Sequence, residues 1–162
     1  MHRALLALSA VLAASAVLAP GASAQAPAPI TLTLKALDKG STFAAVDLPP
    51  RAPRSHGFPT RFSPGDMLVF SNPLRDSANQ PFGHLRVTCF TTVGGLKGAR
   101  FSCLGVYGFP NGQVWATATT SPLSTVDTGV IIGGTGAYAN MRGTFVSTHT
   151  KTGSDDTLTL LP

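Results

Sequence analysis

Apolar and polar residues alternate in short stretches along most of the chain. The clearest stretch is 30–37, ITLTLKAL, in which every second residue is apolar. A period of two is typical of a half-buried β-strand, and no segment after residue 24 has the roughly 3.6-residue apolar period of a helix. Seven further strands are predicted at residues 66–72, 82–93, 99–107, 113–120, 126–132, 138–150 and 157–161.

Short strands separated by Gly, Pro and Asn turns predict an all-β fold. The eight strands indicate an antiparallel barrel or a sandwich, and an eight-stranded β-barrel is favoured because closure removes the edges that a Val- and Thr-rich sheet would otherwise expose. A barrel of about eight strands has an interior that is filled by side chains or by one small ligand.

The first residues have the three-part layout of a secretory signal peptide. His2 and Arg3 precede an apolar run at 4–19, and Ala22-Ser23-Ala24 forms a small-x-small cleavage site. We therefore expect a secreted or otherwise extracytoplasmic protein, with no integral membrane span after residues 1–24 are removed.

The remaining chain is long enough for one domain with a core. A Pro/Ala tail is expected over 25–29, and a single barrel domain over 30–162. Five prolines at 49–64 predict an irregular loop within that domain.

The chain is basic but sparsely charged. Its formal net charge is +5, from 12 Lys and Arg against 7 acidic residues, all of them Asp. The basic residues are not interleaved with aromatic residues in a stripe, as a nucleic-acid surface would require, so no nucleic-acid partner is expected.

Cys89 and Cys103 lie equally far from Leu96, in the middle of a predicted hairpin loop. They are expected to face each other across the two strands, at about the Cα separation that a disulfide allows. An exported protein meets an oxidising environment. We predict a Cys89–Cys103 disulfide, with a free, functional Cys89 as the alternative.

Two glycine motifs carry the most specific signal: 65–76, GDMLVFSNPLRD, and 130–145, VIIGGTGAYANMRGTF. The spacing of Gly133, Gly134 and Gly136 fits neither a dinucleotide fingerprint nor a phosphate loop. It predicts a tight turn, with glycines at positive φ, before a strand that begins near Tyr138. Together the motifs resemble those of the allene oxide cyclase and dirigent superfamily.

The resemblance spans about residues 34–161 and implies a calycin-like barrel with a hydrophobic cavity. Asn72 is similar to the cyclase Asn that helps hold a water against the substrate, and Cys89 occupies the place of a cavity Cys. The cyclase Glu and its partner Asn correspond to Lys35 and Leu37, so the carboxylate role has no occupant there. Dirigent proteins have Asp at the Asn72 position, and an Asn cannot serve as that acid.

The candidate site follows from these positions and from strand alternation. In the segment 82–93 the apolar set that includes Leu85 and Cys89 is expected to face inward, and the set that includes His84 to face outward. No catalytic residue is assigned, and Asn72 and Tyr107 are the candidates. The expected ligand-binding residues are Phe70, Asn72, Leu85, Tyr107 and Trp115.

The other polar residues have ordinary interpretations. His149 is expected on an outer face, and Asp155-Asp156 in a solvated turn. No His or Cys pair has metal-ligand spacing, and we expect neither a metal nor a cofactor.

The sequence is compatible with two candidate functions. The first is a secreted barrel that binds a small hydrophobic molecule. The second is a cofactor-free isomerase, cyclase or dirigent-like enzyme that directs the stereochemistry of a reactive guest. Homo-oligomerisation is left open.

Overall fold

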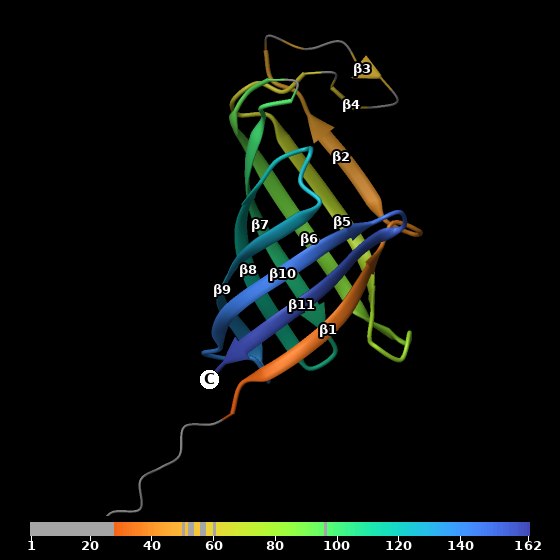
Figure 1. Cartoon of the computed structure of the whole chain (residues 1–162), viewed down its shortest axis with the longest axis vertical. Coiled ribbons are helices and arrows are strands. Elements are labelled where there is room, and N and C mark those ends of the chain that lie inside the picture. The colour runs from red at the N-terminus through yellow and green to blue at the C-terminus, as the bar shows by residue number, and fades with distance from the viewer. Residues whose placement is uncertain (1–27, 50, 52–53, 56–57, 60, 96) are drawn as a thin grey trace, which may run out of the picture.

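The computed structural model describes residues 28–49, 51, 54–55, 58–59, 61–95 and 97–162. All the regular elements in these residues are β-strands, as the alternation predicted (Figure 1). The predicted signal peptide, the start of the tail and parts of the Pro-rich loop lie outside the described residues.

Nine strands form one antiparallel sheet in the order β1-β11-β10-β9-β8-β7-β6-β5-β2, and a pairing between β1 and β5 closes it. Eight of them make the barrel and β2 is an additional strand. Their bounds are β1 Ile30–Leu37, β2 Thr42–Val46, β5 Met67–Arg75, β6 Pro81–Val93, β7 Arg100–Phe109, β8 Gly112–Thr120, β9 Val126–Gly136, β10 Arg142–Thr150 and β11 Gly153–Leu161. Two residues each form β3 (Arg54–Ser55) and β4 (Phe58–Pro59), a separate small pair.

The barrel closes at β5, which pairs with both β1 and β2. One end of β5, at Leu74 and Arg75, pairs with β1, and the segment 67–71 pairs with β2. A short turn at Asp38–Ser41 connects β1 to β2, and Gly40 within it has a φ of 84°. The strand β2 was absent from the sequence prediction, because TFAAV has no clear alternation of apolar and polar residues.

The glycines at 133–136 were predicted to form a turn, but they lie in a strand. Strand β9 continues through the glycines to Gly136, and the turn lies after it, with Tyr138 buried. Only Gly136 of this group has a positive φ. At Gly134 a Cβ would clash with the carbonyl oxygen of Tyr138, so this glycine allows a close backbone approach rather than a turn.

The Cys hairpin agrees with its prediction. Cys89 and Cys103 are register partners on β6 and β7, and they form a disulfide with a Cα–Cα distance of 4.0 Å. Both side chains are buried, together with Phe101. The alternative of a free Cys89 is therefore wrong.

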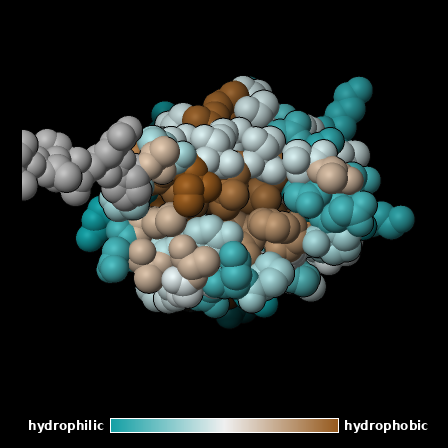
Figure 2. All heavy atoms as spheres, turned by 90° about the horizontal axis from the view of Figure 1, so that it is seen from below, coloured by the Kyte–Doolittle hydropathy of each residue, from teal (hydrophilic) through white to brown (hydrophobic). Residues whose placement is uncertain are grey.

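One end of the barrel is filled by side chains. Phe109 contacts Phe82 and Tyr138, with ring centroids 5.1 and 5.2 Å apart, and Leu158 and Leu160 pack into the same cluster without any exposed surface. Seen from this end, apolar side chains gather in the middle and polar ones surround them (Figure 2). We call this the closed end. Its packing confines any internal cavity to the other part of the barrel.

Candidate functional site

A cavity of about 590 Å³ occupies the part of the barrel away from the closed end. Its rim is formed by three connections: the β1–β2 turn, the segment 121–125 between β8 and β9, and the β10–β11 turn. The volume lies within the range of about 300–1,000 Å³ that is typical of small-molecule sites.

One side of this cavity is apolar. It is built by inward-facing residues of β5, β6 and β7, because alternate residues of a strand share a face. They include Leu68, Phe70, Leu85, Val87, Phe101 and the disulfide. Phe70 and Leu85, two of the predicted ligand-binding residues, line the cavity, and the disulfide is part of its wall.

The opposite side is polar, and it comes from β9, β10 and β11. Asp127, Ser147, His149 and Ser154 line it. No lysine or arginine of the described residues lines the cavity. The polar groups here are therefore neutral or acidic, with His149 as the one base.

Asp156 does not line the cavity and has no exposed surface, but it contacts two residues that do. Its Oδ2 accepts a hydrogen bond from the Tyr107 hydroxyl at 3.1 Å, and its Oδ1 accepts one from the Ser147 hydroxyl at 2.7 Å. The expectation of a solvated Asp155-Asp156 turn is wrong for Asp156, because β11 begins at Gly153 and its alternation turns Asp156 inward with Leu158 and Leu160.

Tyr107 lines the cavity, as predicted, but its hydroxyl proton is directed to Asp156. Burial raises the pKa of Tyr107 well above its ordinary value, and the negative charge and hydrogen bond of Asp156 raise it further. Tyr107 is therefore a neutral hydroxyl whose oxygen can accept a hydrogen bond from a guest.

Asn72 also lines the cavity and is buried. Its amide nitrogen donates to the main-chain carbonyl of Leu37, with a distance of 3.0 Å, and so links β5 to the end of β1. Its Oδ1 has no hydrogen-bond partner among the described residues. Asn72 can thus hold the barrel closed and accept a hydrogen bond from a guest.

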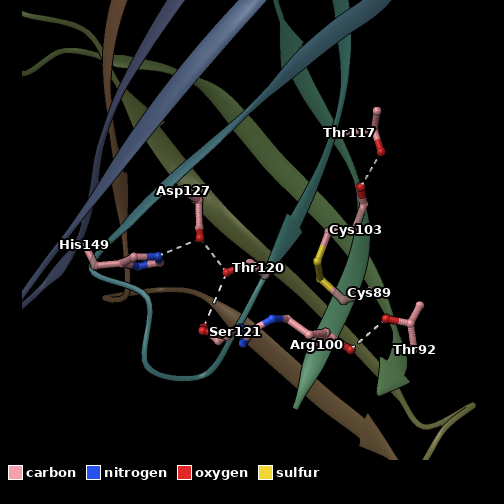
Figure 3. The surroundings of a disulfide bond; sticks show 9 residues. All are labelled: Cys89, Thr92, Arg100, Cys103, Thr117, Thr120, Ser121, Asp127 and His149. Atoms are coloured by element: carbon pink, nitrogen blue, oxygen red, sulfur yellow. Dashed lines mark hydrogen bonds and ion pairs between the residues drawn. A yellow bond between two sulfur atoms is a disulfide. The ribbon is translucent and has the colours of Figure 1, made fainter. Parts of the chain in front are cut away.

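His149 lies at the mouth of the cavity, so its expected position on an outer face is wrong. Phe145, Ser147 and His149 share the inward face of β10, while His84 on β6 is exposed as expected. The His149 Nε2 lies 2.8 Å from Asp127 Oδ2, and the Thr120 hydroxyl donates to Asp127 Oδ1 at 2.5 Å. Figure 3 shows the three side chains directed toward one another, near the disulfide.

Trp115 does not line the cavity, and this part of the predicted site is wrong. Its side chain is 43% exposed on the outside of β8, while its neighbours Val114 and Ala116 are buried. Both faces of this strand contain apolar residues, and the small side chains of β8 are the ones that fit inside the barrel.

Sequence reasoning missed Asp127, His149 and Asp156. A signal existed: stepping by two from the buried Phe145 reaches Ser147 and His149, and stepping back by two from Leu158 reaches Asp156. Their meeting depends on the pairing of β9, β10 and β11, which alternation within one strand does not reveal.

Among the residues that the structure describes, no group of three or more His, Cys, Asp or Glu side chains is arranged to hold a metal ion. The same residues contain no helix that is long and apolar enough to cross a membrane.

No family model and no curated protein sequence matches the chain. Solved structures do match it. A pyocyanin demethylase is 25% identical with a TM-score of 0.59, and the match covers 81% of this chain and 99% of that one.

Two further structures are similar at lower identity. A Diels–Alderase from Streptomyces koyangensis is 15% identical with a TM-score of 0.57, covering 86% of this chain and 70% of that one. A pterocarpan synthase dirigent protein is 13% identical with a TM-score of 0.54, and the match covers 90% of this chain and 96% of that one. The chain therefore shares the fold of these structures, a closed antiparallel barrel of eight strands.

Proposed function

We propose that this protein binds a small, largely apolar molecule in the cavity of its barrel. The observation that carries the proposal is the cavity of about 590 Å³, apolar on one side and polar on the other. Such a lining favours a guest with an apolar body and a few polar atoms, because the apolar area drives binding and the polar groups set its orientation.

The charges of the lining narrow the class of guest. No lysine or arginine of the described residues is available in the cavity to pair with a carboxylate or phosphate, although the chain as a whole is basic. An anionic guest would be desolvated without a partner charge, which is costly. We therefore favour a guest without an anionic group.

A second candidate function is catalysis without a cofactor, by an isomerase, cyclase or dirigent-like enzyme. The polar wall favours it, since it sets a base and hydroxyl groups against an otherwise apolar space. The similar structures point the same way, as they include proteins named as a demethylase, a Diels–Alderase and a pterocarpan synthase. The absence of Glu from the chain still argues against the chemistry of the plant cyclases.

Binding can be tested with Nile red, a neutral apolar dye whose fluorescence rises in apolar surroundings. We expect saturable binding at one site per chain. Ala118→Phe fills the cavity from β8, whereas Thr119→Phe adds the same ring on the outer face of the same strand. The first change should weaken binding at least about tenfold, equivalent to roughly 1.4 kcal/mol, and the second should leave it unchanged.

Equal affinity of the two variants would reject the cavity as the site. A finer test is Asn72→Asp, which keeps the shape but replaces the amide that donates to Leu37. Loss of thermal stability with unchanged dye affinity would give Asn72 a purely structural role.

We further propose that the protein is exported and that its mature chain begins near Gln25. The disulfide supports this, since such bonds persist in oxidising compartments. Intact mass spectrometry of protein from its own producer tests it. A mass that includes residues 1–24 would contradict export by signal cleavage.

A further inference from the structure

We propose that His149 is a proton acceptor at the cavity mouth, oriented by Asp127, and that it acts on a guest with an acidic C–H or O–H group. The inference rests on the proposed binding function and deepens it, because it assigns a chemical step to the site. Three residues carry it: Thr120 at the end of β8, Asp127 near the start of β9 and His149 near the end of β10.

The hydrogen bonds determine which nitrogen of His149 can take a proton. An ionised carboxylate only accepts hydrogen bonds, so the Nε2 atom that lies 2.8 Å from Asp127 must be the protonated nitrogen of the neutral ring. The lone pair is then on Nδ1. This atom has no hydrogen-bond partner among the described residues, so it is available to a guest.

Asp127 is itself held in place. Its side chain is only 15% exposed, and the Thr120 hydroxyl donates to the carboxylate oxygen that does not contact His149. The backbone of His149 is also anchored, because its N–H donates to the carbonyl of Thr125 at 2.9 Å. A base whose orientation is set by a third group is a recurring arrangement in catalytic sites.

The position of His149 suits turnover as well as proton removal. His149 lines the cavity, where a guest would lie, and its side chain is 48% exposed. A proton taken from the guest can therefore pass from the imidazolium to water. Asp127 stabilises the imidazolium while it exists, because the two opposite charges are in contact.

A generic probe of proton abstraction tests the proposal without knowledge of the natural guest. Nitrobenzisoxazole is a small, neutral aromatic molecule that opens when a base removes its one acidic carbon-bound proton. The C–H electron pair becomes part of the new C≡N bond as the ring N–O bond breaks, and the oxygen leaves as a coloured phenolate. The proton goes to Nδ1 and then to water, so no other reactant is needed.

We expect the wild-type protein to open the probe faster than free imidazole at the same concentration. His149→Gln should lower kcat/KM at least about tenfold, given that general bases contribute roughly 10²–10⁴-fold. His84→Gln is the matched control, since His84 is exposed on the outer face of β6. It should leave the rate unchanged.

Asp127→Asn tests the orienting role. The amide can donate to Nε2, which moves the ring proton to Nδ1 and removes the base, so kcat should fall while KM stays nearly constant. A purely structural role for Asp127 would change stability and KM instead.

Nile red binding is measured for every variant, so loss of the cavity is distinguished from loss of the base. Wild-type activity in a dye-binding His149→Gln protein would overturn the proposal. So would an equal loss in His84→Gln, or a wild-type rate no higher than that of imidazole. If His149→Gln does not bind the dye, the kcat of a dye-binding Asp127→Asn protein decides, and an unchanged kcat rejects the dyad.

Discussion

The closed end and the mouth of this barrel are built from the same strands, yet they differ in what fills them. At the closed end, large apolar side chains such as Phe109, Leu158 and Leu160 meet in the interior. Toward the mouth, Gly105, Ala116 and Ala118 face inward and leave space, and polar groups line one wall. The size of inward side chains along each strand therefore decides where the barrel is core and where it is a cavity.

The two regions also differ in the kind of interaction that they contribute. Burial of apolar area stabilises the closed end. Near the mouth, buried polar groups are present, and each needs a partner to avoid the cost of desolvation. We therefore expect substitutions at the closed end to lower stability without changing the site, and substitutions in the cavity wall to change stability, the site or both.

The largest expected effect is at the closed end. Leu160→Ala should lower the free energy of unfolding by about 2–5 kcal/mol, because it removes a fully buried side chain and leaves a cavity. Urea denaturation measures this, with the exposed neighbour change Leu161→Ala as the control. Nile red affinity of the folded protein should remain the same, and a large loss of affinity would break the distinction between the two regions.

The disulfide should have the next largest effect. Replacing both Cys89 and Cys103 by Ser should cost about 3 kcal/mol in the chain-entropy account, given their sequence separation of 14. The denaturation midpoint of the double variant should match that of the reduced wild-type protein. A midpoint equal to that of the oxidised wild-type protein would show that the bridge does not stabilise the fold.

A smaller loss of stability is expected at Asp156, which supports two residues of the cavity lining. Asp156→Ala leaves the hydroxyls of Tyr107 and Ser147 without their acceptor, which should cost about 1–3 kcal/mol. Asp155→Ala, on the exposed neighbour, should stay within about 0.5 kcal/mol of wild type. Equal melting temperatures for the two variants would contradict the buried role of Asp156.

The smallest effect is a dependence of stability on alkaline pH. The pKa of Tyr107 is higher in the folded chain than the ordinary value of about 10 in the unfolded chain. The folded state therefore holds this proton more tightly, so the contribution is complete below pH 10 or so and is lost as the pH rises above it. Tyr107→Phe should remove this part of the decline in melting temperature, and an unchanged decline would exclude Tyr107 as its source.

Local pattern was enough to predict much of this protein. The alternation in ITLTLKAL predicted β1 with the bounds that the structure has. The equal spacing of Cys89 and Cys103 about a hairpin loop predicted their register and their disulfide. These features are properties of one strand or one hairpin, where neighbours in sequence are also neighbours in space.

Local pattern was not enough for strands in which either face could have been the one that points into the barrel. In β8 the large Trp115 lies outside and small residues lie inside, because the available volume is a property of the whole barrel. In β11 Asp156 is buried because Tyr107, distant in sequence, supplies a donor across the interior. Only the assembled barrel decides such cases.

The sequence by itself determined that the chain forms antiparallel strands, which hairpin carries the disulfide, and that Leu85 and Tyr107 lie inward. The tertiary structure decided the closure of β1 and β2 onto β5 and the meeting of Thr120, Asp127 and His149. The physical reason is that alternation assigns residues to the faces of a single strand. The pairing of separate strands, which depends on the whole closed sheet, determines the side chains that come into contact.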